Sequence, residues 1–180
     1  MGENGAGKST LMKVLTGIHD ANEGTIHYNG KQVAYSKPKE AMEDGIVIVH
    51  QELNMMNHLT VAQNIFIGRE EFRHNLLIDD GASIKKAKKL FDLLKLDINP
   101  TEKVGNLTVG KQQMVEIAKA LSMDAKVIVF DEPTAALTES EINELFVIID
   151  DLRAKGVGII YISHRMDEIA RITDRVTVMR

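Results

Sequence analysis

Short runs of consecutive apolar residues recur along the chain and are separated by polar segments. Such runs are typical of strands that are buried on both faces of a sheet. We expect strands of this kind at residues 46–49, 127–130 and 158–162, and the start of another at residues 175–179.

Between these strands, apolar residues recur at the spacing of amphipathic helices. Helices are expected over residues 8–16, 38–45, 110–122, 139–155 and 165–171. The helix that follows residue 138 is well specified, because Thr138 and Glu141 form a capping box at its start and Gly156 follows its end. Buried strands that alternate with amphipathic helices predict an α/β fold with a mostly parallel sheet.

Two regions depart from this alternation. Asn29 and Gly30 give the strongest short-range signal for a β-hairpin, between strands expected at residues 25–28 and 32–35. From residue 53 to residue 105 the strand signals fade and helical spacing dominates, so we expect a mostly helical insertion. The lysine run at residues 85–89 fits a solvated helix face better than a binding patch.

Composition narrows the class of protein. The chain has 180 residues, 27% of them charged, and a formal net charge of −4, so it offers no broad basic surface for nucleic acid. Cysteine is absent, which excludes disulfides and cysteine-ligated zinc and suits a reducing compartment. No apolar run approaches the ~18–20 residues that cross a bilayer. We therefore expect one soluble domain that meets a membrane only through partners.

A glycine-rich segment at the start of the chain matches the phosphate-loop pattern. Its expected cofactor-binding residues are Gly2, Glu3, Asn4, Gly5, Ala6, Gly7, Lys8, Ser9 and Thr10. Glycines let backbone amides turn toward phosphate oxygens, and the helix that follows adds the positive end of its dipole. We expect Lys8 to contact the β- and γ-phosphates and Ser9 to ligate Mg²⁺. The alternative is an ordinary glycine turn, but a random chain of this length matches the pattern only on the order of once in a hundred.

Two acidic residues follow the apolar run at 127–130. Asp131 and Glu132 stand at the carboxyl end of the expected strand, where open α/β sheets bind their ligands. We expect Asp131 to hold Mg²⁺ through water, and Glu132 to orient and polarise the attacking water. Acidic residues also end strands at turns, and Pro133 marks a turn, but the phosphate loop favours the catalytic interpretation.

Residues 107–113 read Leu-Thr-Val-Gly-Lys-Gln-Gln and resemble the signature sequence of ATP-binding-cassette (ABC) ATPases. Gln51 after one strand, the Asp-Glu-Pro-Thr segment at 131–134 after another, and His164 after a third follow the order of that family. The resemblance covers essentially the whole chain. It implies a P-loop NTPase cassette with a mostly parallel sheet core, a small antiparallel β element and an inserted helical subdomain.

The resemblance also implies a head-to-tail dimer, in which each ATP lies between the phosphate loop of one cassette and the signature of the other. The signature residues expected to contact nucleotide are Thr108, Val109, Gly110, Lys111 and Gln112. Thr108 is expected to cap its helix as well. The family further implies that Gln51 contacts Mg²⁺ and the water, and that His164 contacts the γ-phosphate and holds Glu132 in register. Gln51, Glu132 and His164 are thus the expected catalytic residues, and Ser9, Gln51 and Asp131 the expected metal ligands.

Departures from the family pattern indicate one branch of it. Thr108 replaces the usual serine of the signature, Val109 its first glycine, and Thr138 stands where an aspartate is usual. The chain in this respect resembles the ATPases of bacterial monosaccharide importers of the ribose, galactose and xylose type. That branch implies ATP hydrolysis coupled to sugar import, membrane permease subunits, an external sugar-binding protein and a peripheral place on the cytoplasmic face of the inner membrane.

We divide the expected cassette into a RecA-like core at residues 1–52 and 111–180, which carries the small β element, and a helical subdomain at residues 53–110. ATPases of this branch usually carry two fused cassettes, and this chain resembles an excerpt of a first cassette without the opening strand and the adenine-stacking aromatic. Two alternatives remain at this point. One is a soluble ABC-type ATPase that acts in translation or on DNA, and the other is a truncated, non-catalytic nucleotide-binding module.

Overall fold

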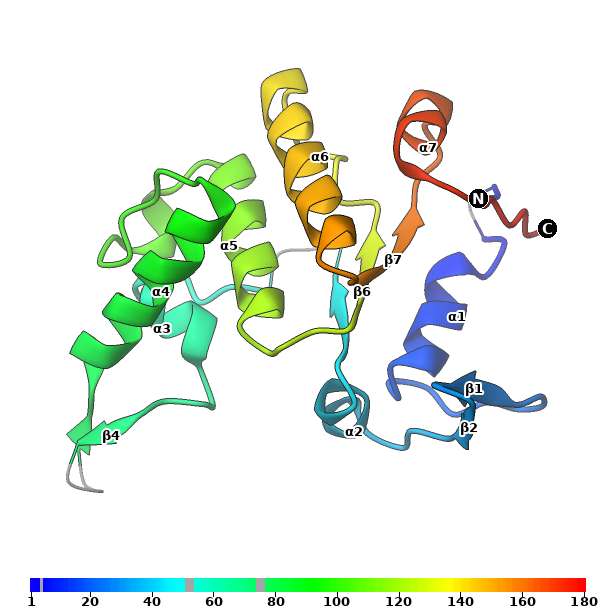
Figure 1. Ribbon diagram of the computed structural model, residues 1–180, viewed down its shortest axis with the longest axis horizontal. Helices are drawn as coiled ribbons and strands as arrows, with labels where there is room; N and C mark the ends of the chain where they lie inside the picture. The colour runs from blue at the N-terminus through cyan, green and yellow to red at the C-terminus, as the bar shows by residue number, and fades with distance from the viewer. Residues whose placement is uncertain (4, 51–53, 74–76) are drawn as a thin grey trace. The chain divides into compact units, whose positions relative to one another are not determined.

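The computed structural model describes residues 1–3, 5–50, 54–73 and 77–180, whose elements are shown in Figure 1. The chain forms two compact units. The first comprises Met1–Gln51, Ala125–Pro133 and Ile149–Arg180, and the second comprises Glu52–Asp124 and Thr134–Ile148. The boundary that we place at residue 110 from the sequence therefore falls inside the second unit, which continues to Asp124.

A parallel sheet forms the centre of the first unit. Strands β3 (Ile46–Val49), β6 (Val127–Asp131) and β7 (Gly158–Ile162) lie in the order β3-β6-β7, and each pairs in parallel with its neighbour. The apolar runs of β3 and β6 are largely buried, and Phe130 is completely inaccessible to solvent. The run of β7 is only half-buried, apart from the buried Ile162. Because the strands are parallel, the residues that follow each of them emerge at the same edge of the sheet.

Helices accompany the sheet in the same unit. They are α1 (Lys8–Leu15), α2 (Pro38–Glu43), α7 (Met166–Ile172) and the end of α6 (Glu139–Ala154), which runs through both units. The predicted capping box of α6 is confirmed: the amide of Thr138 donates to Oε2 of Glu141 over 2.9 Å, and the amide of Glu141 donates to Oγ1 of Thr138 over 3.4 Å. Its predicted apolar stripe is also buried.

The predicted hairpin is present as strands β1 (Ile26–Tyr28) and β2 (Lys31–Val33), which pair antiparallel with Tyr28 opposite Lys31. The two turn residues, Asn29 and Gly30, have φ angles of 50° and 75°. This left-handed backbone matches the twist of the strands in a two-residue hairpin, which explains why an Asn-Gly pair predicts the turn correctly.

Residues 175–179 do not form the strand that we expect from their sequence. Their backbone bonds Met1 instead: the amino-terminal nitrogen of Met1 donates to the Thr177 carbonyl, and the Met179 amide donates to the Met1 carbonyl, each over 2.8 Å. These bonds involve one residue of the amino terminus, and residues 175–179 have no strand assignment. The approach is close, because a Cβ at Gly2 would lie 2.4 Å from the Met179 carbonyl oxygen.

The second unit is mostly helical, as predicted. Helices α3 (Val61–Phe66), α4 (Asp80–Leu94) and α5 (Val109–Leu121) pack against one another (Figure 1). Side chains cap all three helices: Thr60 accepts from the amide of Gln63, Asp79 from that of Ala82 and Thr108 from that of Lys111.

Short elements of this unit escape the sequence analysis. Strands β4 (Phe72–Arg73) and β5 (Leu77–Ile78) pair antiparallel, and a 3-10 helix, η1 (Val104–Asn106), precedes α5. Elements of this length carry no periodicity that could identify them. The lysines at residues 85, 86, 88 and 89 are exposed on α4, which confirms a solvated face. Among the described residues, no helix is both long enough and apolar enough to span a bilayer.

Candidate nucleotide-binding site

The phosphate loop lies directly before α1 in the first unit. Gly5 and Gly7 have φ angles of 85° and 84°, a backbone region that residues with a Cβ rarely adopt. A Cβ at Gly5 would meet no atom within 4 Å, so conformation rather than space requires glycine there. Gly7 is the N-cap of α1 and has no side chain to bond the first amides of the helix, which suits these amides to an anion. Asn4 lies outside the described residues.

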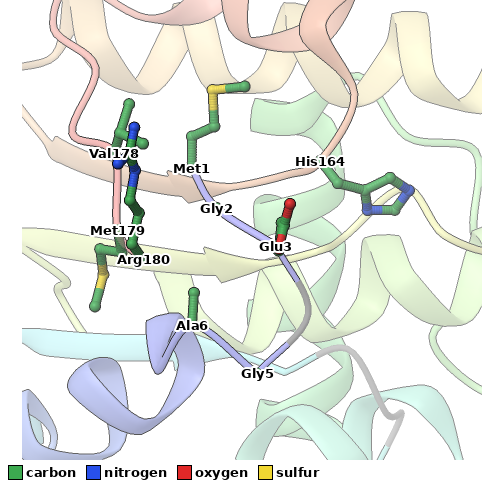
Figure 2. Close-up of a pocket in the computed structure, with 9 residues that line it drawn as sticks. All are labelled: Met1, Gly2, Glu3, Gly5, Ala6, His164, Val178, Met179 and Arg180. Atoms are coloured by element: carbon green, nitrogen blue, oxygen red, sulfur yellow. The ribbon is translucent and has the colours of Figure 1, made fainter.

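A cavity of about 730 Å³ adjoins this loop. Figure 2 shows its lining, which includes Gly2, Gly5 and Ala6 of the loop together with His164. Residues at the end of the chain, among them Met179, line it as well. The loop and the histidine that we select from distant parts of the sequence thus border one space.

Lys8 is 8% exposed and its side chain turns back over the loop. Its ammonium nitrogen donates to the carbonyl oxygens of Gly2 and Glu3, over 2.8 and 3.0 Å. These bonds hold the ammonium beside the glycine-rich backbone. An ammonium carries three N–H donors, so the group has the capacity to contact a phosphate oxygen in the same loop.

Ser9 and Asp131 supply two oxygens at one place. The Ser9 hydroxyl donates to Oδ1 of Asp131 over 3.0 Å, and Asp131 is only 7% exposed at the end of β6. Hydroxyl and carboxylate oxygens are the ligands that Mg²⁺ prefers, and the ion is commonly bound by one or two protein groups together with substrate phosphates. The donor set therefore fits magnesium. Gln51, the third expected ligand, lies outside the described residues.

Glu132 and His164 face each other at the same edge of the sheet. Nδ1 of His164 lies 3.4 Å from Oε2 of Glu132, and the two side chains are 63% and 17% exposed. Glu132 has a φ of 48°, a left-handed conformation that costs about 1–3 kcal/mol in a non-glycine residue. Its amide donates to the Ile162 carbonyl of the neighbouring strand over 3.0 Å. This bond holds Glu132 in place as the chain leaves β6.

The signature segment belongs to the second unit. Thr108 is exposed and caps α5, with its hydroxyl oxygen 3.3 Å from the amide nitrogen of Lys111. Val109 and Lys111 are also exposed, whereas Gly110 is buried. The side-chain nitrogen of Gln112 donates to backbone carbonyls 3.1 and 3.2 Å away, so it fixes the start of α5.

Gly110 has a close neighbour that the sequence analysis missed. A Cβ at this position would lie 1.8 Å from Oε1 of Glu141, so the carboxylate sits against the glycine backbone. Glu141 cannot easily withdraw, because the capping box holds it at the start of α6. The sequence identifies Glu141 as a capping residue but gives no sign of this contact.

The comparison with protein families decides the assignment. A family model described as "ABC transporter" matches residues 1–135 of the chain. This chain belongs to the ABC transporter family. A nucleotide-free ATP-binding cassette from an ABC transporter, known from its crystal structure, is 32% identical with a TM-score of 0.86, over 99% of this chain and 74% of that one. The predicted ABC cassette fold is thereby confirmed.

Curated ABC relatives are named for sugar import. A putative ribose/galactose/methyl galactoside import ATP-binding protein of Burkholderia lata is 59% identical over 181 residues, which cover 100% of this chain and 35% of the relative. A ribose import ATP-binding protein of Geobacillus kaustophilus is 54% identical, over 100% of this chain and 37% of the relative. The predicted likeness to this branch is confirmed. The chain spans about a third of the length of the curated relatives that it matches.

Proposed function

We propose that this ABC chain binds Mg-ATP and hydrolyses it, as part of an ATPase that drives the import of a monosaccharide. One observation carries the proposal: the Ser9–Asp131 hydrogen bond and the Glu132–His164 pair lie at the same edge of the parallel sheet. The first pair offers two oxygens that could bind a metal, and the second offers a carboxylate in contact with a histidine. Phosphoryl transfer requires this combination of positioning and charge stabilisation.

Each group has a distinct task in this proposal. The loop from Gly2 to Thr10 wraps the phosphates, and Lys8 contacts the β- and γ-phosphates. Ser9 and Asp131 would hold Mg²⁺, which neutralises phosphate charge when it is bound. Glu132, with Gln51, orients a water that attacks the γ-phosphorus, and the carboxylate of Glu132 accepts the proton that this water loses. The bond from that phosphorus to the β–γ bridging oxygen breaks, and ADP and phosphate leave.

The signature provides a second half-site for nucleotide on a different surface. The exposed Thr108 hydroxyl and the amino-terminal end of α5 behind it suit an anion. We propose that Thr108, Val109, Gly110 and Lys111 meet the γ-phosphate of an ATP held by a second cassette in a head-to-tail dimer. Gln112 supports this surface through its bonds to backbone carbonyls.

Sugar import is favoured by the names of the relatives, which do not favour an ATPase of translation or DNA maintenance. Such a role requires permease subunits in the membrane and an external sugar-binding protein, and it places the chain at the cytoplasmic face of the inner membrane. Nucleic acid is not among the proposed partners, because a net charge of −4 gives the chain no broad basic surface.

Steady-state ATP hydrolysis tests the enzymatic part of the proposal. Glu132→Gln keeps the size of the side chain but removes its charge, and we expect it to lower kcat by about a hundredfold or more. Glu144→Gln is the matched control, because Glu144 is an exposed carboxylate on α6. Hydrolysis that survives Glu132→Gln would contradict the role of Glu132, and a folded wild-type protein that binds ATP without turnover would indicate the non-catalytic module. Uptake of labelled ribose and galactose into vesicles that contain the permease tests the transport part.

A further inference from the structure

Glu168 is a buried carboxylate outside the phosphate site. It lies on α7, is 1% exposed, and bonds polar groups of Tyr161, Ser163 and Arg165. The Tyr161 hydroxyl and the Ser163 hydroxyl donate to its Oε2 over 2.9 and 2.8 Å, and Nε of Arg165 lies 3.2 Å from its Oε1. A buried charge is tolerated only when it is paired and hydrogen-bonded, as here.

Two of the groups that bond Glu168 flank one residue of the candidate site. Ser163 and Arg165 are the immediate neighbours of His164 along the chain. The Arg165 amide also donates to the Ser163 hydroxyl oxygen over 3.0 Å, while that hydroxyl donates to Glu168. The turn that carries His164 is therefore closed on itself and anchored to a single buried carboxylate.

His164 itself depends on this turn for its position. Figure 2 shows its imidazole projecting from the chain just beyond β7, and 63% of its side chain is exposed. Its contact with Glu132 spans 3.4 Å, a separation that a small shift of the backbone would lengthen beyond hydrogen-bonding reach. The contact between His164 and Glu132 therefore depends on the groups that hold the backbone of residues 163–165 in place.

We propose that Glu168 is a positioning residue, which holds the turn from Ser163 to Arg165 so that His164 stays in contact with Glu132. The inference rests on the proposed function, because it gives His164 a task in hydrolysis. Tyr161 adds rigidity, since its ring packs against Phe130 with centroids 6.3 Å apart while its hydroxyl bonds the carboxylate. Glu168 thus links the strands of the sheet to the histidine.

The test is a double-mutant cycle between Glu168 and His164, measured as ATP hydrolysis by the full-length protein. We expect Glu168→Gln to lower kcat by about tenfold or more and to leave the KM for ATP within about twofold, because only the alignment of the reacting groups changes. In a His164→Ala background the same substitution should lower kcat no further, since its effect passes through the histidine. An equal loss in both backgrounds would show that Glu168 only stabilises the fold, and would overturn the proposal.

Asp167→Asn is the matched control. Asp167 is an exposed carboxylate on the same helix and pairs with the same arginine, over 3.2 Å, and we expect its loss to leave kcat within about twofold. Equal losses of kcat for Asp167→Asn and Glu168→Gln would show that the effect comes from Arg165 losing a carboxylate partner. That result would contradict a specific role of Glu168 in holding the turn.

A second variant serves if Glu168→Gln does not fold. Ser163→Ala keeps the charges of Glu168 and Arg165 but removes the hydroxyl that links Glu168 to the Arg165 amide. It should reproduce the loss in kcat. Unchanged kcat in this variant would overturn the proposal. A wild-type enzyme that Glu132→Gln silences but Glu168→Gln does not affect overturns this inference alone. Absence of any hydrolysis that depends on Glu132 overturns the proposed function, and this inference with it.

Discussion

The Ser9 hydroxyl donates to Oδ1 of Asp131 over 3.0 Å, although 122 positions separate the two residues in the sequence. Ser9 lies in the first turn of α1 and Asp131 is the last residue of β6, so the bond joins the phosphate loop to the centre of the sheet. The fold therefore brings together the two oxygens that we propose as Mg²⁺ ligands.

Ser9→Ala should weaken the response of the enzyme to Mg²⁺. The substitution removes one proposed ligand and leaves the buried Asp131 carboxylate without its hydroxyl donor. We expect the Mg²⁺ concentration for half-maximal hydrolysis to rise by about tenfold or more, as for loss of a group that orients a metal site. Magnesium titrations of ATP hydrolysis measure this, with Ser140→Ala on the exposed face of α6 as control. Equal magnesium requirements in the three proteins would refute the assignment.

Lys8→Ala should weaken nucleotide binding. The ammonium lies inside the loop, beside the carbonyls of Gly2 and Glu3, where a phosphate group would gain a charge-assisted hydrogen bond. We expect the dissociation constant for ATP to rise by about tenfold to a hundredfold, since such a bond is worth roughly 1.5–3 kcal/mol. Calorimetric titration measures it. Lys13→Ala removes a charge from the last turn of the same helix and should bind ATP as the wild type does.

Gly110→Ala should disturb α6 as well as the signature. A Cβ at this position would lie 1.8 Å from Oε1 of Glu141, so the carboxylate must leave its bonds to Thr138. We expect a loss of about 1 kcal/mol in the free energy of unfolding, the usual worth of a helix cap. In a Glu141→Ala background the bonds from Thr138 to the carboxylate are already absent, so the same substitution should cost less. Urea denaturation of the four proteins measures both costs, and equal costs would disprove the contact.

Much of the fold follows from patterns within single segments. The runs that form β3 and β6 predict their own burial, and Asn29 with Gly30 predicts a turn because both residues tolerate the left-handed backbone that it needs. The run that forms β7 predicts the strand, but only Ile162 of it is buried. The phosphate loop and the acid pair of residues 131 and 132 are recognisable because their chemistry requires fixed residue types at fixed spacing.

Other features depend on contacts between distant segments. Residues 175–179 have the composition of a strand, but in the part of the chain that the structure describes their backbone bonds Met1 rather than a neighbouring strand, so no ladder forms. The contact between Glu141 and Gly110 leaves no signal in the sequence around either residue. Glu168 does give one: it precedes Ile169 and stands four positions before Ile172, which places it on the buried face of α7. An acidic residue on an apolar helix face marks a buried charge, whose partners only the structure supplies.

Tyr35 provides a contact whose strength should depend on pH. Its hydroxyl donates to Oδ2 of Asp44 over 2.7 Å, and the side chain is 9% exposed. Burial raises the pKa of Tyr35, and the hydrogen bond to the nearby Asp44 carboxylate raises it further. In the unfolded chain a tyrosine ionises near pH 10. Above that pH the unfolded chain has released a proton that the folded protein retains.

The free energy of unfolding should therefore fall as pH rises above about 10, by up to about 1.4 kcal/mol per pH unit for this one group. Below that pH the stabilisation by Tyr35 is fully present, and the group adds no pH dependence. Tyr35→Phe removes the group that titrates, so the variant should lose less stability than the wild type between about pH 9 and pH 11. Tyr28→Phe is the matched control, because the Tyr28 hydroxyl donates to the Asp44 carbonyl over 3.2 Å and its removal leaves Tyr35 in place. Urea denaturation at both pH values measures the change in the free energy of unfolding for the wild type and the two variants. Lysines that deprotonate in this range affect all three proteins alike, so an alkaline loss in Tyr35→Phe as large as that of the wild type would show that the phenol does not retain its proton in the fold.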